Sequence, residues 1–178
     1  MLEFREDLEY YWVDGPGYPV TGAQSCGLLK DLLMAFRSKK RGTFYFSHSG
    51  ALLKFLTYLG LYKDQHDLRS DNFEEMRHNR LWRTSKIGPF AGNVVFVLMD
   101  CDDQSLLSCN GGDYGEAVLL YVNEELTAIP GCGKDGWGKD RCTLEKLEEL
   151  FSGPCDFETI CNIGQEDTGD GEVPDDKY

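Results

Sequence analysis

A histidine lies where a short aromatic segment gives way to an apolar helix. Residues 43–46 are β-branched or aromatic throughout, which is typical of a strand, and apolar residues recur at helical spacing after His48. Ligands of open α/β sheets usually bind where a strand ends and the next helix begins. His48 is therefore the first candidate functional residue, although on this pattern alone a structural histidine at a strand end is the commoner case.

Two arginines form a second candidate group, in a stretch without acidic residues. Arg80 and Arg83 lie three residues apart beside Trp82, so on one helix they would point together and could hold one phosphate. The alternative is a solvated basic face, which is the commoner role of such clusters.

The cysteines favour disulfides over a metal site. All but Cys26 of the 7 cysteines lie after residue 100, in Gly-rich surroundings without any Cys-x-x-Cys pair. The spacing predicts bridges between Cys132 and Cys142 and between Cys155 and Cys161. The odd number leaves Cys26 or another cysteine without a partner.

Composition and charge limit the class of protein. The 178 residues, 41% of them hydrophobic, fit one globular domain or part of a larger one. The net charge of -13 argues against nucleic-acid binding, which needs a basic face. The longest apolar run, residues 94–99, is far shorter than the ~20 residues that cross a bilayer.

The two ends of the chain carry further expectations. Residues 165–178 contain six acids and one lysine and are predicted to be a disordered tail. The first residues lack the pattern of a secretory signal, whereas disulfides require a secretory route. We therefore expect that Met1 is not the natural N-terminus.

These residues are carried by a predicted mixture of helices and strands. The apolar spacing predicts helices over residues 3–13 and 23–37, the second capped by Thr21, one after His48, and a last one capped by Thr143. Residues 43–46 and 94–99 are predicted strands, the latter buried on both faces. Residues 117–122 and 126–129 are predicted to form a hairpin.

Several motifs, in this order, resemble the C-terminal portion of the histidine acid phosphatases, most closely the animal multiple inositol polyphosphate phosphatases. At the centre, residues 46–53 read FSHSGALL and resemble the family's Phe-Gly-His-Ala-Glu-Thr-Leu-Leu. The segments DLEYYW at residue 7, RLWR at residue 80, PFAGN at residue 89 and RCTL at residue 141 are also similar. Each motif alone is weak, but their common order over most of the chain is specific.

The resemblance implies a fold and an activity. The fold would be a partial α/β domain of the phosphoglycerate-mutase-like type over residues 1–164, with a C-terminal β-hairpin and disulfide-stapled loops. The activity would be hydrolysis of phosphomonoesters such as inositol polyphosphates through a phosphohistidine, without a metal or other cofactor. His48 would contact the transferring phosphoryl group. The protein would reside in the endoplasmic reticulum lumen, at the cell surface or outside the cell.

Two departures from the family pattern qualify that expectation. The nucleophile motif Arg-His-Gly-x-Arg-x-Pro is absent, so the chain is expected to need the N-terminal half of the domain as a partner and to be inactive alone. Gly50 stands at the position of the family's general acid, and loss of such an acid typically costs about 10² to 10⁴ in rate. The alternatives are a catalytically dead protein that binds phosphorylated ligands and a secreted, disulfide-rich interaction module.

Overall fold

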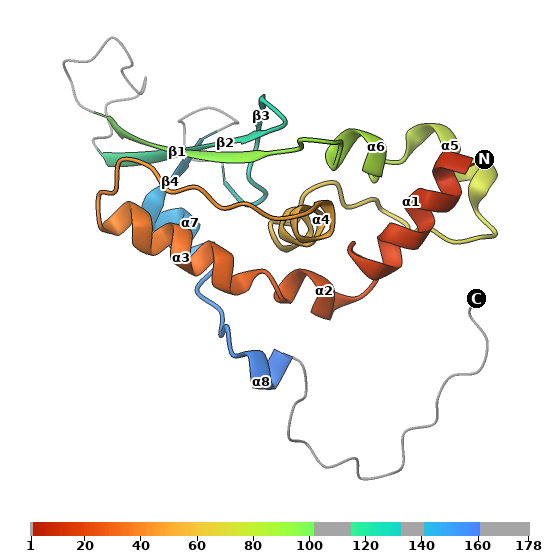
Figure 1. Ribbon diagram of the computed structural model, residues 1–178, viewed down its shortest axis with the longest axis horizontal. Helices are drawn as coiled ribbons and strands as arrows, with labels where there is room; N and C mark the ends of the chain where they lie inside the picture. The colour runs from red at the N-terminus through yellow and green to blue at the C-terminus, as the bar shows by residue number, and fades with distance from the viewer. Residues whose placement is uncertain (1, 102–114, 133–140, 161–178) are drawn as a thin grey trace.

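The first half of the chain is helical and the second half contains the sheet, in a computed structural model that describes residues 2–101, 115–132 and 141–160 (Figure 1). The helices are α1 (Leu2–Val13), α2 (Pro19–Ala23), α3 (Cys26–Arg37), α4 (Ser49–Tyr58), α5 (Phe73–Asn79), α6 (Thr84–Ile87), α7 (Leu144–Leu150) and α8 (Phe157–Ile160). The strands are β1 (Val94–Cys101), β2 (Gly115–Val122), β3 (Glu125–Thr127) and β4 (Arg141–Thr143). This mixture confirms the predicted class, and the predicted tail at residues 165–178 lies outside the described residues.

The sheet is antiparallel, with β2 in its centre. Strand β2 pairs with β1, β3 and β4, and Leu120 faces Phe96 across the first of these pairs. The prediction that residues 94–99 are buried on both faces is wrong, because Val95 and Val97 are 45% and 36% exposed. Antiparallel sheets commonly have one solvated face, and here helices α3, α4 and α7 lie on the other one (Figure 1).

The predicted hairpin is present and is tied to the rest of the fold through its turn. Asn123 and Glu124 have positive φ angles of 49° and 70°, as a two-residue hairpin turn of type I′ requires. The Asn123 side chain accepts a hydrogen bond from the Asn93 backbone N–H at 3.0 Å and donates one to the Lys86 carbonyl at 3.0 Å. The turn therefore fixes the segment that leads from α6 into β1.

The core lies between the sheet and the helices beneath it. Leu29 of α3, Leu56 of α4, Leu120 of β2 and Leu147 of α7 are each at most 1% exposed and belong to one hydrophobic cluster. Burial of such side chains contributes roughly 1.5–3 kcal/mol each. None of the helices in the described ranges is both long and apolar enough to cross a membrane.

Two of the predicted helix starts have different outcomes. The predicted helix over residues 23–37 is divided, since α2 ends at Ala23 and α3 begins at Cys26. Thr21 does not cap α3, because it lies inside α2 and is buried. Thr143 does cap α7: its hydroxyl oxygen accepts a hydrogen bond from the Lys146 backbone N–H at 3.1 Å.

One of the two predicted disulfides is found and the other is replaced. Cys132 and Cys142 are bonded, with Cα atoms 5.1 Å apart, as predicted. Cys155, however, is bonded to Cys26 at a Cα distance of 5.7 Å, so the predicted pair of Cys155 with Cys161 is wrong, and Cys26 is not left over. The spacing argument failed because folding brings the start of α3 close to the segment after α7, 129 residues later. Cys161 lies outside the described residues.

Candidate active site

The aromatic segment before His48 is extended but is not part of the sheet. Residues 42–48 have no helical or strand assignment, which corrects the predicted strand over residues 43–46. Phe44 and Phe46 are 83% and 94% exposed, and the segment links α3 to α4 as an open connection (Figure 1). A strand needs a neighbour to pair its backbone N–H and C=O groups, and within the described ranges the sheet takes no pair from this segment.

His48 lies at the N-terminus of α4, as the change of period predicted. It is the N-cap residue, with extended backbone angles (φ -118°, ψ 169°) and no side-chain cap hydrogen bond. Its side chain is exposed, and the first turn of α4 contains no acidic residue. The first backbone N–H groups of a helix are free and carry a partial positive charge, so an anion is favoured beside His48.

Asp14, from the turn after α1, lies against the same end of α4. A Cβ atom built on Gly50 would lie 2.8 Å from Oδ2 of Asp14 and 3.3 Å from Cε1 of His48. A side chain at position 50 would therefore collide with the Asp14 carboxylate, which occupies that space. Asp14 itself is only 9% exposed, and its backbone N–H donates to the Tyr10 carbonyl at 2.9 Å. The site thus contains a carboxylate, although Gly50 supplies none.

Lys54 holds the other oxygen of this carboxylate. Its Nζ lies 3.5 Å from Oδ1 of Asp14 and donates a hydrogen bond to Oε1 of Gln24 at 3.0 Å. Residues 50 and 54 share one face of α4, because they are separated by about one turn. The two oxygens of Asp14 therefore face different neighbours: Oδ1 faces an ammonium group and Oδ2 faces Gly50.

Sequence reasoning did not identify Asp14 or Lys54. Asp14 precedes a Gly-Pro-Gly turn, which reads as the end of a helix and carries no catalytic signature. A usable signal was the spacing of Gly50 and Lys54 on one helix face, since a small residue there leaves room for a side chain from elsewhere. Local patterns could not show that this side chain comes from Asp14, 36 positions earlier in the sequence.

Arg80 does not lie beside His48. Its side chain is 1% exposed, and Nε and Nη2 donate to Oδ2 of Asp7 at 2.8 and 2.5 Å. The other oxygen of Asp7 accepts from the backbone N–H and the hydroxyl of Thr84, at 2.8 and 2.7 Å. Asp7 and Asp14 are two turns of helix apart, which is about 10 Å along the axis. The guanidinium of Arg80 is thus enclosed and already paired.

Arg80 and Arg83 also do not share a helix, which corrects the geometry predicted for them. Helix α5 ends at Asn79 and α6 begins at Thr84. The chain breaks there because the Asp64 carboxylate accepts hydrogen bonds from the backbone N–H groups of Leu81 and Trp82, at 2.6 and 3.1 Å. Arg83 is half-buried and donates to the Arg77 carbonyl at 3.1 Å, while its Nε has no hydrogen-bond partner.

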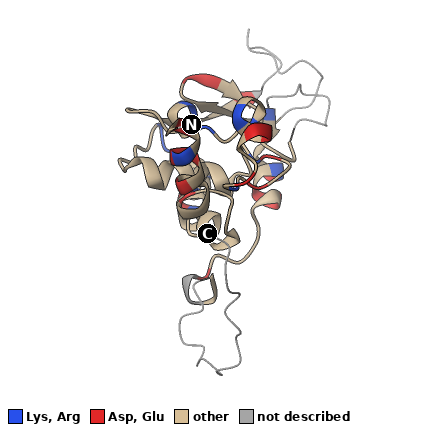
Figure 2. Ribbon diagram, turned by 90° about the vertical axis from the view of Figure 1, so that its right-hand side faces the viewer, with Lys and Arg blue, Asp and Glu red and all other residues tan. Residues whose placement is uncertain are grey.

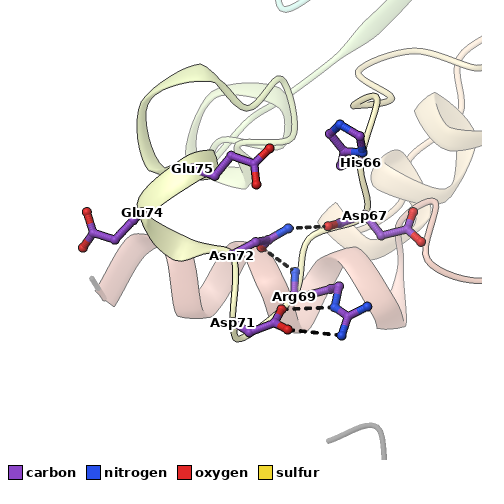
Figure 3. A pocket seen from close by; sticks show the side chains of 7 residues that line it. All are labelled: His66, Asp67, Arg69, Asp71, Asn72, Glu74 and Glu75. Carbon is purple, nitrogen blue, oxygen red and sulfur yellow. Dashed lines mark hydrogen bonds and ion pairs between the residues drawn. The ribbon is translucent and has the colours of Figure 1, made fainter.

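A separate pocket lies between α5 and the segment that precedes it (Figure 3). It is lined by His66, Asp67, Arg69, Asp71, Asn72, Glu74 and Glu75. Its lining contains four carboxylates and one arginine, and Arg69 is already paired with Asp71 at 3.1 Å. This charge disfavours a phosphate ester.

Tyr11 connects that pocket to the core. Its hydroxyl donates to Oδ1 of Asp67 at 2.7 Å. Burial and this hydrogen bond raise the pKa of Tyr11 well above its usual range, so the hydroxyl remains a proton donor at every physiological pH. The contact fixes Asp67 at the pocket wall.

The described part of the chain offers no metal-binding cluster, and charges of both signs lie at the end formed by α1 and α5 (Figure 2). No group of three or more His, Cys, Asp and Glu residues is placed to hold a metal ion among the residues with described positions. Figure 2 faces the end formed by α1 and α5, where acidic positions outnumber basic ones, since α1 contains Glu3, Glu6, Asp7 and Glu9 but only Arg5 as a basic residue. At the candidate site, the positive groups are the ammonium of Lys54 and the free N–H groups at the start of α4.

Comparison with known proteins identifies the family. Residues 2–114 match the histidine phosphatase superfamily (branch 2), and this match covers more than half of the chain. The chain therefore belongs to the histidine phosphatase superfamily (branch 2).

Several curated relatives are inositol polyphosphate phosphatases by name. The chain is 33% identical over 167 residues to multiple inositol polyphosphate phosphatase 1 of Drosophila melanogaster. This alignment covers 92% of the chain and 33% of the relative. The human protein of that name is 32% identical over 114 residues, an alignment that covers 58% of the chain and 23% of the human protein. An acid phosphatase of Schizosaccharomyces pombe is 24% identical over 174 residues, covering 90% and 36%. The chain thus spans about a third or less of these relatives.

Proposed function

We propose that this chain is the C-terminal portion of a phosphatase that hydrolyses inositol polyphosphates through a phosphohistidine. The observation that carries the proposal is His48 at the N-terminus of α4, with no acid in the first turn and with Lys54 on the same helix. Imidazole, ammonium and free backbone N–H groups are the groups that neutralise a transferring phosphoryl group. The relatives named after inositol polyphosphates support the choice of substrate.

The nucleophile belongs to a segment outside this chain in this proposal. A histidine of the N-terminal half attacks phosphorus, His48 contacts the phosphoryl oxygens, and water then hydrolyses the phosphohistidine. The exposed aromatic segment at residues 42–48 supports the need for that half, because a neighbouring strand would cover Phe44 and Phe46 and pair their backbone groups. We expect the reaction to use no cofactor.

The proposed compartment is the secretory pathway, from the endoplasmic reticulum lumen to the cell exterior. The two disulfides, Cys26 with Cys155 and Cys132 with Cys142, support it, since disulfides persist in oxidising compartments and are rare in the cytosol. Non-reducing electrophoresis of the protein from secreting cells, with and without alkylation before lysis, tests this. Full alkylation of Cys26 and Cys155 in fresh lysate would contradict it.

The experiment that tests the activity uses the gene product together with whatever sequence its gene encodes before Met1, expressed through the secretory pathway. We expect it to release phosphate from inositol hexakisphosphate and from p-nitrophenyl phosphate. The variant His48→Ala should lose most of the activity on both substrates, whereas His66→Ala, in the acidic pocket, should retain it. A folded parent protein that hydrolyses neither substrate would contradict the proposal.

A phosphate-binding protein without activity is the second candidate, and Gly50 favours it. Position 50 offers no carboxyl group as proton donor. Such a protein would be stabilised against heat by inositol hexakisphosphate in proportion to binding, and it would release no phosphate. The phosphate-release assay and the thermal shift, measured on the same preparation, separate the two functions.

A further inference from the structure

We propose that Asp14 is the proton donor of this phosphatase, in the place that a side chain at position 50 would take. This inference rests on the proposed function. An inositol ester needs such a donor, because its leaving oxygen would otherwise depart as a strongly basic alkoxide. General acid catalysis typically contributes 10² to 10⁴ in rate, roughly, and Gly50 has no group that could supply it.

The position of Asp14 fits this role. Its Oδ2 and Cε1 of His48 lie 2.8 and 3.3 Å from one point, the Cβ position above Gly50. His48 faces solvent at the start of α4, whereas Asp14 is 9% exposed behind it. An ester whose phosphoryl group contacts His48 would therefore bring its bridging oxygen to the end of α4 where Asp14 lies.

Glycine at position 50 leaves the space that the Asp14 carboxylate occupies. Any larger residue would place its Cβ at 2.8 Å from Oδ2 of Asp14, which is too close for non-bonded carbon and oxygen atoms. Gly50 and Asp14 are thus complementary: the glycine leaves a space at the start of α4, and the Asp14 carboxylate occupies it from the turn after α1. This accounts for the glycine without loss of activity.

The two carboxylate oxygens of Asp14 have different roles in this proposal. Oδ2, which faces Gly50 and His48, is the donating oxygen in this proposal, while Oδ1 lies 3.5 Å from Nζ of Lys54. Donation of the proton leaves a negative charge on Asp14, and the ammonium group of Lys54 stabilises this charge as it develops. Lys54 is itself held by Oε1 of Gln24 at 3.0 Å.

The reaction balances in two steps. A nucleophilic imidazole from the N-terminal half forms a nitrogen–phosphorus bond while the ester P–O bond breaks, and the leaving oxygen keeps the electron pair and takes the Asp14 proton. Water then attacks phosphorus, its proton returns to the Asp14 carboxylate, and the nitrogen–phosphorus bond breaks to release phosphate. No oxidant, reductant or metal enters either step.

Leaving-group dependence tests the role of Asp14 in the full gene product. Nitrophenolate leaves without a proton, whereas an inositol oxygen does not. Asp14→Asn should therefore lower kcat on inositol hexakisphosphate by about 10²-fold or more, with a change of less than tenfold on p-nitrophenyl phosphate. Asp31→Asn, which neutralises an exposed acid of α3, is the matched control and should change neither rate.

Relocation of the carboxyl group provides a second variant. Gly50→Glu alone should gain nothing, since its side chain collides with Asp14, whereas Asp14→Gly combined with Gly50→Glu should recover hydrolysis of inositol hexakisphosphate. Thermal unfolding shows which variants are folded. If Asp14→Asn does not fold, the comparison of Gly50→Glu with the double variant tests the role of Asp14 instead.

Three results would overturn the proposal. Equal losses on both substrates in Asp14→Asn would show that Asp14 positions the site without donating a proton. A folded relocation variant that hydrolyses only p-nitrophenyl phosphate would do so as well. A parent protein inactive on both substrates would refute the proposed function and this inference with it. If the parent protein hydrolyses p-nitrophenyl phosphate, the phosphatase function stands and the variants test the role of Asp14 alone.

Discussion

At the scale of single residues, two carboxylates of the same helical region have opposite roles. Asp7 is buried and satisfied by Arg80 and Thr84, whereas Asp14 has one oxygen toward Lys54 and the other toward Gly50 and His48. Removing one partner of a fully satisfied buried pair is strongly destabilising, and an oxygen without a cation beside it is available to a ligand. Arg80 therefore belongs to the folded framework and Asp14 to the site.

Removing the Asp7 charge tests the structural role of Arg80. Asp7→Asn leaves the guanidinium of Arg80, with its side chain 1% exposed, only the half-exposed carboxylate of Glu3 at 3.5 Å. Breaking a buried pair costs about 3–5 kcal/mol. We expect that loss in the free energy of unfolding, measured by urea denaturation. Asp71→Asn removes the exposed partner of Arg69 and should change little. A small loss in Asp7→Asn would contradict the structural role assigned to Arg80.

At the scale of elements, apolar spacing and turn residues correctly predicted the helices and the hairpin that depend on local interactions. The helices at residues 2–13 and 49–58 and the hairpin through Asn123 follow from apolar spacing and turn chemistry. The strand at residues 43–46 was predicted by the same rules, yet it needs a partner that the described chain does not supply. The carboxyl group beside Gly50 could not be predicted, since Asp14 reaches it through tertiary packing.

The cap of α7 is an element whose contribution can be measured. Thr143→Ala removes the acceptor of the Lys146 N–H, and loss of an N-cap side chain costs about 1 kcal/mol. We expect that loss in urea denaturation. Ser25→Ala is the control, because Ser25 occupies the N-cap of α3 without a side-chain hydrogen bond. Equal losses in both variants would contradict the assigned cap.

The segment at residues 42–48 makes a prediction about backbone exchange. Its amides should exchange rapidly in the 178-residue chain, because the segment has no strand partner and Phe46 is 94% exposed. They should become protected when the N-terminal half of the domain is present. Hydrogen–deuterium exchange of peptides 42–48 and 49–58 in both forms measures this, with α4 as the internal reference. Unchanged exchange in the longer protein would show that no strand is added there.

At the scale of the whole molecule, the two disulfides in the described part of the chain differ in what they hold together. Cys26–Cys155 joins residues 129 positions apart, whereas Cys132–Cys142 closes a loop of 10. The shorter bridge could be predicted from spacing because it is local. The longer one could not, since it depends on the packing of α3 and α7 beneath the same sheet (Figure 1).

The separation predicts unequal losses of stability. On a chain-entropy account, a loop of about 130 residues gives a bridge worth about 5 kcal/mol and a loop of 10 one worth about 3 kcal/mol. The double variant Cys26→Ser with Cys155→Ser should therefore unfold at lower urea than Cys132→Ser with Cys142→Ser. Peptide mapping without reduction should recover Cys155 joined to Cys26. A peptide that joins Cys155 to Cys161, or the reverse order of stabilities, would contradict this arrangement, because neither is compatible with α3 fastened to the segment after α7.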